Sequence, residues 1–105
     1  MLYGTVHYSS GGAHNYLANR TVLSAPLSSA YHVYEVVWTP TTIDWYIDDV
    51  KYGHLDITGA IDNSAFTGNP FYMILNYAIG GSWAEAPNPL QYPGEMRVDW
   101  VRYWH

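Results

Sequence analysis

PFYMILNYAIGGSW, residues 70–83, alternates two sets of large side chains along its first half. Phe71, Met73, Leu75 and Tyr77 form one set of this alternation. A period of two built from aromatic and β-branched residues is typical of a β-strand. The glycine pair 80–81 follows, and such pairs mark a turn or a place where another group approaches the backbone. We therefore predict a strand over residues 70–77 that ends in a turn.

Asn76 is the unusual residue of this strand, because an amide in a largely apolar run needs hydrogen-bond partners. Neighbouring backbone groups satisfy most such amides. Next to a Gly-Gly-x-Trp turn, sugar hydroxyls are the other class of partner that fits. The residues themselves leave both readings open.

The rest of the chain reads as further strands separated by polar turns, with no long helix, repeat or heptad pattern. We expect strands over residues 2–8, 32–38, 43–47, 51–55 and 95–104. Residues 14–29 are mixed and polar, so we expect a long connection there, with at most a short strand near 21–25. The predicted class is all-β, as an antiparallel sandwich in one domain spanning residues 1–105.

Residues 32–48 predict a hairpin whose turn lies at Thr39–Thr42. This register pairs apolar side chains across the strands on one face, which we expect to be core. The expected pairs are Trp38 with Ile43, Val36 with Trp45, and Tyr34 with Ile47. The reverse face then carries Glu35, Asp44, Tyr46 and Asp48. A second turn is expected at Asp48-Asp49.

Charge and composition exclude several classes of partner. The chain has a formal net charge of -5 and only 4 Lys and Arg residues, so nucleic acid and anionic membranes are not expected partners. No apolar run has the ~20 residues of a membrane helix, and the first residues lack the pattern of an export signal. The chain has no cysteine, and 17% of it is aromatic, which suits β-cores, interfaces and sugar stacking alike.

Two kinds of residue are candidates for chemistry. Glu35 and Asp44 share the polar hairpin face, and pairs of carboxyl groups perform glycoside hydrolysis. The alternative is that they are solvated charges, because nothing apolar nearby would raise a pKa as a general acid requires. The five histidines show no metal-ligand spacing and are not expected to form a metal site. His7, on a predicted strand, is either a cleft residue or a structural histidine.

Several segments together resemble the second half of the laminarinase and lichenase group, glycoside hydrolase family 16. They are HVYEVVWTPTTIDWYIDDVKY (32–52), PFYMILNYAIGGSW (70–83) and MRVDWVRYWH (96–105), and GTVHY (4–8) looks like the strand after the family's catalytic strand. The resemblance implies a concanavalin-like β-jelly roll, extracellular, that cleaves β-1,3 or mixed β-1,3-1,4 glucans with retention of configuration. The family's Glu-x-Asp-x-x-Glu catalytic strand precedes the position of GTVHY and is absent from these 105 residues. The chain therefore looks like half of a jelly roll.

By the same resemblance, Asn76, Trp83 and His7 match positions that line the glucan cleft. Asp99 matches an aspartate that helps to hold a structural calcium, whose other ligands are expected from a preceding segment. No other cofactor is implied.

Half a sandwich leaves strand edges and apolar surface uncovered, so we expect a homo-oligomer, with strand exchange as one route. Three functions remain open at this point. The first is a glucan-binding remnant with lost or much reduced hydrolysis. The second is an active hydrolase whose carboxylate pair is recruited through oligomerisation, and the third is an inert folding fragment. Glu35, Asp44 and Glu95 are the carboxylates available for such a recruited pair.

Overall fold

The computed structural model describes residues 1–58, 66, 68–82, 86–91 and 93–105. It divides the chain into two compact units, Met1–Pro70 and Phe71–His105. All strands assigned in the described residues belong to the first unit and pair antiparallel, which confirms the all-β class. In the described part of the chain, no helix combines the length and the apolar character needed to cross a membrane. The prediction of one domain over residues 1–105 stays a prediction.

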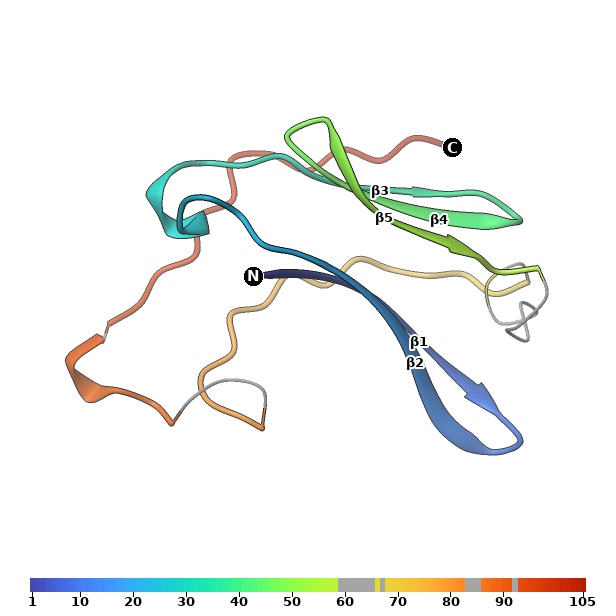
Figure 1. The fold of residues 1–105 in the computed structure, drawn as a ribbon, viewed down its shortest axis with the longest axis horizontal. Helices are drawn as coiled ribbons and strands as arrows, with labels where there is room; N and C mark the ends of the chain where they lie inside the picture. Colours follow the sequence, from blue (N-terminus) through green and yellow to red (C-terminus); the bar gives the residue numbers. More distant parts are fainter. Residues whose placement is uncertain (59–65, 67, 83–85, 92) are drawn as a thin grey trace. The chain divides into compact units, whose positions relative to one another are not determined.

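The first unit opens with a hairpin of two long strands, β1 (Leu2–Ser10) and β2 (Ala13–Thr21) (Figure 1). Gly11 and Gly12 form the two-residue turn, with φ of 59° and 79°. Positive φ at both positions belongs to the type I′ turn that matches strand twist. The expected connection over 14–29 is therefore wrong for its first half, and the short strand near 21–25 is absent. The only regular element in that remainder is the 3₁₀ turn η1 (Leu27–Ser29).

A three-stranded sheet follows, made of β3 (Tyr34–Trp38), β4 (Thr42–Ile47) and β5 (Val50–Asp56) in that order. The observed register confirms the predicted hairpin, because Trp38 pairs with Ile43 and Tyr34 pairs with Ile47. The turn is closed by the Thr39 amide, which donates to the Thr42 carbonyl over 2.9 Å. The predicted turn at residues 48–49 is also present, with both aspartates at positive φ.

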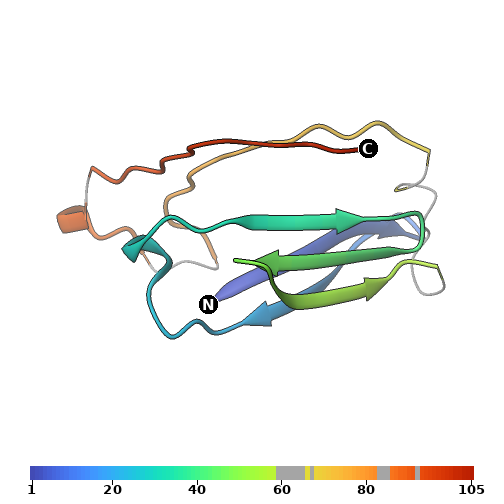
Figure 2. The same ribbon diagram turned by 90° about the horizontal axis from the view of Figure 1, so that it is seen from above.

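The core of the first unit lies between the β1–β2 hairpin and the three-stranded sheet (Figures 1 and 2). Trp45 is 6% exposed, and its indole packs against β1 so closely that a Cβ at Gly4 would lie 2.6 Å from the ring. A Cβ at Gly53 would meet the same ring at 3.0 Å and the Asn19 side chain at 2.8 Å. Glycine at these two positions is therefore what lets the two layers approach. Among the described residues of the unit, the other buried apolar side chains are those of Val6, Ile43, Ile47 and Ile57.

The predicted core face of the 32–48 hairpin is only half correct. Its β4 side chains are buried, but Tyr34, Val36 and Trp38 of β3 are 56%, 58% and 44% exposed. These side chains are exposed because β3 is one edge of the sheet. The β1–β2 hairpin covers the sheet from the opposite edge, where β2 contacts β5. The side-chain Nδ2 of Asn19 donates to the His54 carbonyl over 3.3 Å at that contact.

The second unit carries no assigned strand among its described residues, so the strands predicted over 70–77 and 95–104 are not observed. Alternating side chains give a segment two faces, but a strand also needs a hydrogen-bonded neighbour, which the pattern does not supply. The turn predicted after the first segment is present, because Gly80 and Gly81 have φ of 71° and 109°. Gly94 lies against Tyr77, and a Cβ there would sit 2.6 Å from the hydroxyl. A 3₁₀ turn, η2 (Pro89–Gln91), is the regular element described in this unit.

Candidate functional site

His7 projects from β1 next to a second histidine that the hairpin brings to it. His7 Nδ1 and His14 Nε2 are 3.0 Å apart, and one nitrogen donates to the other. The two rings are nearly parallel, with an interplanar angle of 17° and centroids 5.1 Å apart. The Tyr16 ring lies 6.1 Å from the His7 ring, and all three residues are on paired strands. His7 is exposed, as a residue that contacts a ligand must be.

The carboxylates Glu35 and Asp44 share one face of the sheet, as the register predicts, because Glu35 pairs with Tyr46 and Asp44 with Val37. Asp44 Oδ1 accepts from Lys51 Nζ over 2.9 Å and from His54 Nδ1 over 2.5 Å. These hydrogen bonds, first from Lys51 and then from His54, hold the pKa of Asp44 below its usual range. A general acid needs a raised pKa, so Asp44 is poorly suited to donate a proton to a glycosidic oxygen.

Asp48, the third carboxylate predicted on that face, forms hydrogen bonds to the segment before β3. Its Oδ2 pairs with His32 Nδ1 over 2.7 Å, and its Oδ1 accepts the Val33 amide over 2.9 Å. These two hydrogen bonds, His32 first, lower the pKa of Asp48. Together with the backbone bond from the Asp48 amide to the Val33 carbonyl, they tie the β4–β5 turn to the segment before β3.

The remaining predicted site residues belong to the second unit. Asn76 is exposed and follows the apolar run that precedes the glycine turn. Trp83 lies outside the described residues. Asp99 is exposed, and within the described ranges no group of three or more His, Cys, Asp or Glu side chains could hold a metal ion. The role of Asp99 in holding calcium stays a prediction.

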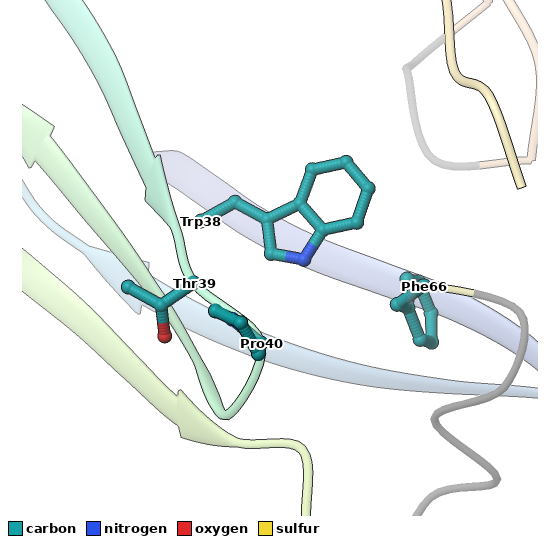
Figure 3. Close-up of a pocket in the computed structure, with 4 residues that line it drawn as sticks. All are labelled: Trp38, Thr39, Pro40 and Phe66. Atoms are coloured by element: carbon teal, nitrogen blue, oxygen red, sulfur yellow. The ribbon is translucent and has the colours of Figure 1, made fainter. Parts of the chain in front are cut away.

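A hollow at the end of β3 was not anticipated from the sequence (Figure 3). It has a volume of about 320 Å³ and is lined by Trp38, Thr39, Pro40 and Phe66. The Trp38 and Phe66 rings meet edge to face at 88°, with centroids 6.5 Å apart. The Trp-Thr-Pro sequence at the end of a strand was the only part of this hollow that the sequence could have indicated. Phe66 is distant in the chain, so its contact with Trp38 could not be predicted. Flat aromatic walls of this kind suit apolar ring faces, including those of sugars.

Each unit exposes side chains of the kinds that can contact sugar rings. Exposed aromatic, amide and imidazole side chains provide stacking and hydrogen bonding, which are the contacts that sugar rings use. Glu35 is exposed, and Asp44 is committed to Lys51 and His54. The pKa of Asp44 is lowered, which is the opposite of what a proton donor to a glycosidic oxygen requires.

Comparison with known proteins gives the chain a family. The chain is 33% identical over 117 residues to a glucan endo-1,3-beta-glucosidase A1 of Niallia circulans, covering 96% of this chain and 16% of that protein. It is 31% identical to the clotting factor G alpha subunit of Tachypleus tridentatus (96% and 15%). It is 30% identical to a beta-glucanase of Rhodothermus marinus (99% and 39%).

These coverages mean that the chain spans well under half the length of each of these relatives. No solved structure matches the chain significantly. The model of the family described as glycosyl hydrolases family 16 matches residues 2–102, which is nearly all of the chain. The resemblance seen in the sequence motifs is thereby confirmed, and this chain belongs to glycosyl hydrolases family 16.

Proposed function

We propose that this chain forms part of the glucan-binding cleft of an endo-β-1,3(4)-glucanase-type domain. The observation that carries the proposal is the family match over residues 2–102, together with relatives whose names specify glucan as the substrate. Asn76, Trp83 and His7 are the residues proposed to contact the sugar. By its family, the protein is proposed to act outside the cell.

Hydrolysis by these 105 residues alone is proposed to be lost or much reduced. Glycoside cleavage needs one carboxyl group that donates a proton and a second one that attacks or activates water. The pKa of Asp44 is lowered by its hydrogen bonds from Lys51 and His54, the opposite of what the donor needs. The Glu-x-Asp-x-x-Glu motif that serves this purpose in the family does not occur in the sequence.

A reducing-sugar assay on laminarin and lichenan tests the catalytic part of the proposal. The expected result is no release above that of buffer over hours with micromolar protein. Glu35→Gln and Asp44→Asn are the controls, because turnover that either substitution abolishes would identify a working carboxylate pair. That outcome would favour the active-enzyme alternative, which the shared face of Glu35 and Asp44 supports.

Calorimetric titration with laminari-oligosaccharides tests the binding part. The expected result is weak but saturable heat. Asn76→Ala is expected to lower the affinity about two- to tenfold, as the loss of one hydrogen bond worth about 0.5–1.5 kcal/mol would. Asn15→Ala, a half-buried asparagine of β2, is the control and is expected to have no effect. Absence of any heat with the wild-type chain would favour the inert fragment.

A homo-oligomer is part of the same proposal. The first unit exposes Tyr34, Val36 and Trp38 along an edge strand, and contiguous apolar surface next to a strand edge favours association. The proposed occupant of this face is a second copy of the chain, either stacked on it or exchanging strands. Such an assembly would also be the route by which a carboxylate of one copy could join a carboxylate of another.

A further inference from the structure

We propose that His7 and His14 form a two-histidine binding site for a divalent transition-metal ion such as Cu²⁺ or Zn²⁺. The supporting observation is the contact between His7 Nδ1 and His14 Nε2 at 3.0 Å, on the exposed side of the β1–β2 hairpin. Residues seven apart in the chain meet only when this hairpin forms, so histidine spacing alone does not reveal the pair. The proposal does not rest on glucan binding.

The nitrogen-to-nitrogen distance is the one a metal ion requires. Imidazole nitrogens lie about 2.0–2.1 Å from a bound zinc, and two neighbouring ligands in square or tetrahedral geometry are then about 2.9–3.4 Å apart. The observed 3.0 Å falls inside that range. The two ring nitrogens face each other, and rotation of each ring by roughly 40° would point both lone pairs at one ion.

The proton balance of binding is simple. In the metal-free pair, one ring carries a proton on the nitrogen that donates to the other ring. When the ion binds between Nδ1 of His7 and Nε2 of His14, that proton moves to the far nitrogen of its own ring. Each ring then contributes one lone pair, and no oxidant or reductant is needed.

The hairpin holds the two ligands before the ion arrives. His7 is paired with Tyr16, and His14 is paired with Ser9, so both histidines lie inside the ladder rather than in the turn. Ordering two ligands in advance lowers the entropy cost of chelation, in the way that linked binding groups raise affinity. Because both side chains are exposed, water fills the remaining coordination positions.

The ligand set also selects the class of ion. Imidazole nitrogen suits Cu²⁺, Ni²⁺ and Zn²⁺, with Cu²⁺ the tightest in the usual order of divalent ions. Calcium and magnesium prefer oxygen ligands, and the pair offers none. Within the described residues no third His, Cys, Asp or Glu joins the two histidines in a metal-binding group, so the site is an open one.

The test is calorimetric titration of the full 105-residue chain with Cu²⁺, combined with electron paramagnetic resonance of the one-to-one complex. We expect one tighter site whose spectrum shows coupling to two imidazole nitrogens. His7→Ala and His14→Ala are each expected to weaken this site by at least about tenfold, because either change removes the chelate. The double variant is expected to lose little more than either single one.

His54→Ala and His105→Ala are the matched controls, since each removes an exposed histidine elsewhere in the chain and should leave the affinity unchanged. Conservative His14→Gln, with folding checked by circular dichroism, separates loss of the ligand from loss of the hairpin. Unchanged affinity in folded His7→Ala or His14→Gln would overturn the proposal. So would loss of the tighter site in His54→Ala, because that result would place the ion at the Asp44–His54 contact.

Discussion

Asp48 links the electrostatics of the first unit to its backbone geometry. It lies at φ 49° in the turn after β4, where few residues other than glycine, asparagine and aspartate are comfortable. Its carboxylate accepts from His32 and from the Val33 amide, and both contacts favour the ionised form. Stability that comes from this group must therefore depend on pH.

The sign of that dependence follows from the direction of the shift. The pKa of Asp48 in the folded chain lies below its ordinary value of about 3.9. Its contribution is then fully present above pH ~4 and is lost as the pH falls through the lower, folded-state pKa. Asp48→Asn keeps an acceptor for Val33 and tolerates positive φ, but it cannot ionise.

We predict that the free energy of unfolding falls less between pH 7 and pH ~3 in Asp48→Asn than in the wild type. Urea denaturation at the two pH values measures both differences. At pH 7 the variant should be the less stable of the two, because it has lost the carboxylate that accepts the hydrogen bond from His32. If the variant lost as much unfolding free energy at low pH as the wild type, other carboxylates would account for the loss of stability in acid.

Gly4 is the residue on which close packing of the two layers depends. A Cβ there would lie 2.6 Å from the Trp45 indole, well inside van der Waals contact. We predict that Gly4→Ala lowers the free energy of unfolding by about 1–3 kcal/mol, as overpacking of a core does. Ser9→Ala, at an exposed position of the same strand, should change it by less than ~0.5 kcal/mol. Equal effects of the two substitutions, measured by urea denaturation, would argue against this contact.

At the scale of elements, the hairpin of β1 and β2 depends on its two-residue turn. Gly11 has φ 59° and no atom within 4 Å of a built Cβ, so a substitution there reports on backbone conformation alone. We predict that Gly11→Val costs about 1–2 kcal/mol, because a β-branched residue is strained at positive φ. Gly11→Asn should be near neutral, since Asn-Gly favours this turn. A neutral Gly11→Val in a thermal-melting comparison would contradict the type I′ assignment.

The sequence predicted some elements and missed others for identifiable reasons. The register of β3 and β4 was predictable because apolar residues alternate on both sides of a short polar turn. β2 was missed because AHNYLANRT has almost no alternation, and the structure leaves most of it exposed. The contact of His7 with His14, and the ion pairs of Asp44, depend on β2 and β5 lying next to their partners. Periodicity within one segment carries no such information.

The cleft residues are a different case. Asn76 was noticed as an amide in an apolar run, but only the resemblance to a family connected it to sugar binding. A single segment shows which residue types alternate, whereas a binding site is made by side chains from several segments. The sugar-binding roles of these positions stay a prediction.

At the scale of the whole molecule, the uncovered apolar side chains of β3 argue for self-association. We predict that light scattering coupled to size exclusion at about 10–50 μM protein will give a mass of at least twice the 11.9 kDa of one chain. Val36→Lys should shift the distribution toward the monomer, because a charge opposes burial of this face. His54→Lys, on β5, is the control. A monomer for the wild type throughout this range would contradict the proposed assembly.

We propose that this chain contributes part of a family 16 cleft that binds β-glucan, with hydrolysis lost or much reduced. A nuclear magnetic resonance titration with laminarihexaose tests binding and hydrolysis in one sample, because protein amides and sugar anomeric protons are observed together. We predict saturable chemical-shift changes at the amides of His7 and Asn76, and no growth of new reducing-end signals over a day. Steady growth of those signals, or a titration that leaves both residues unperturbed, would contradict it.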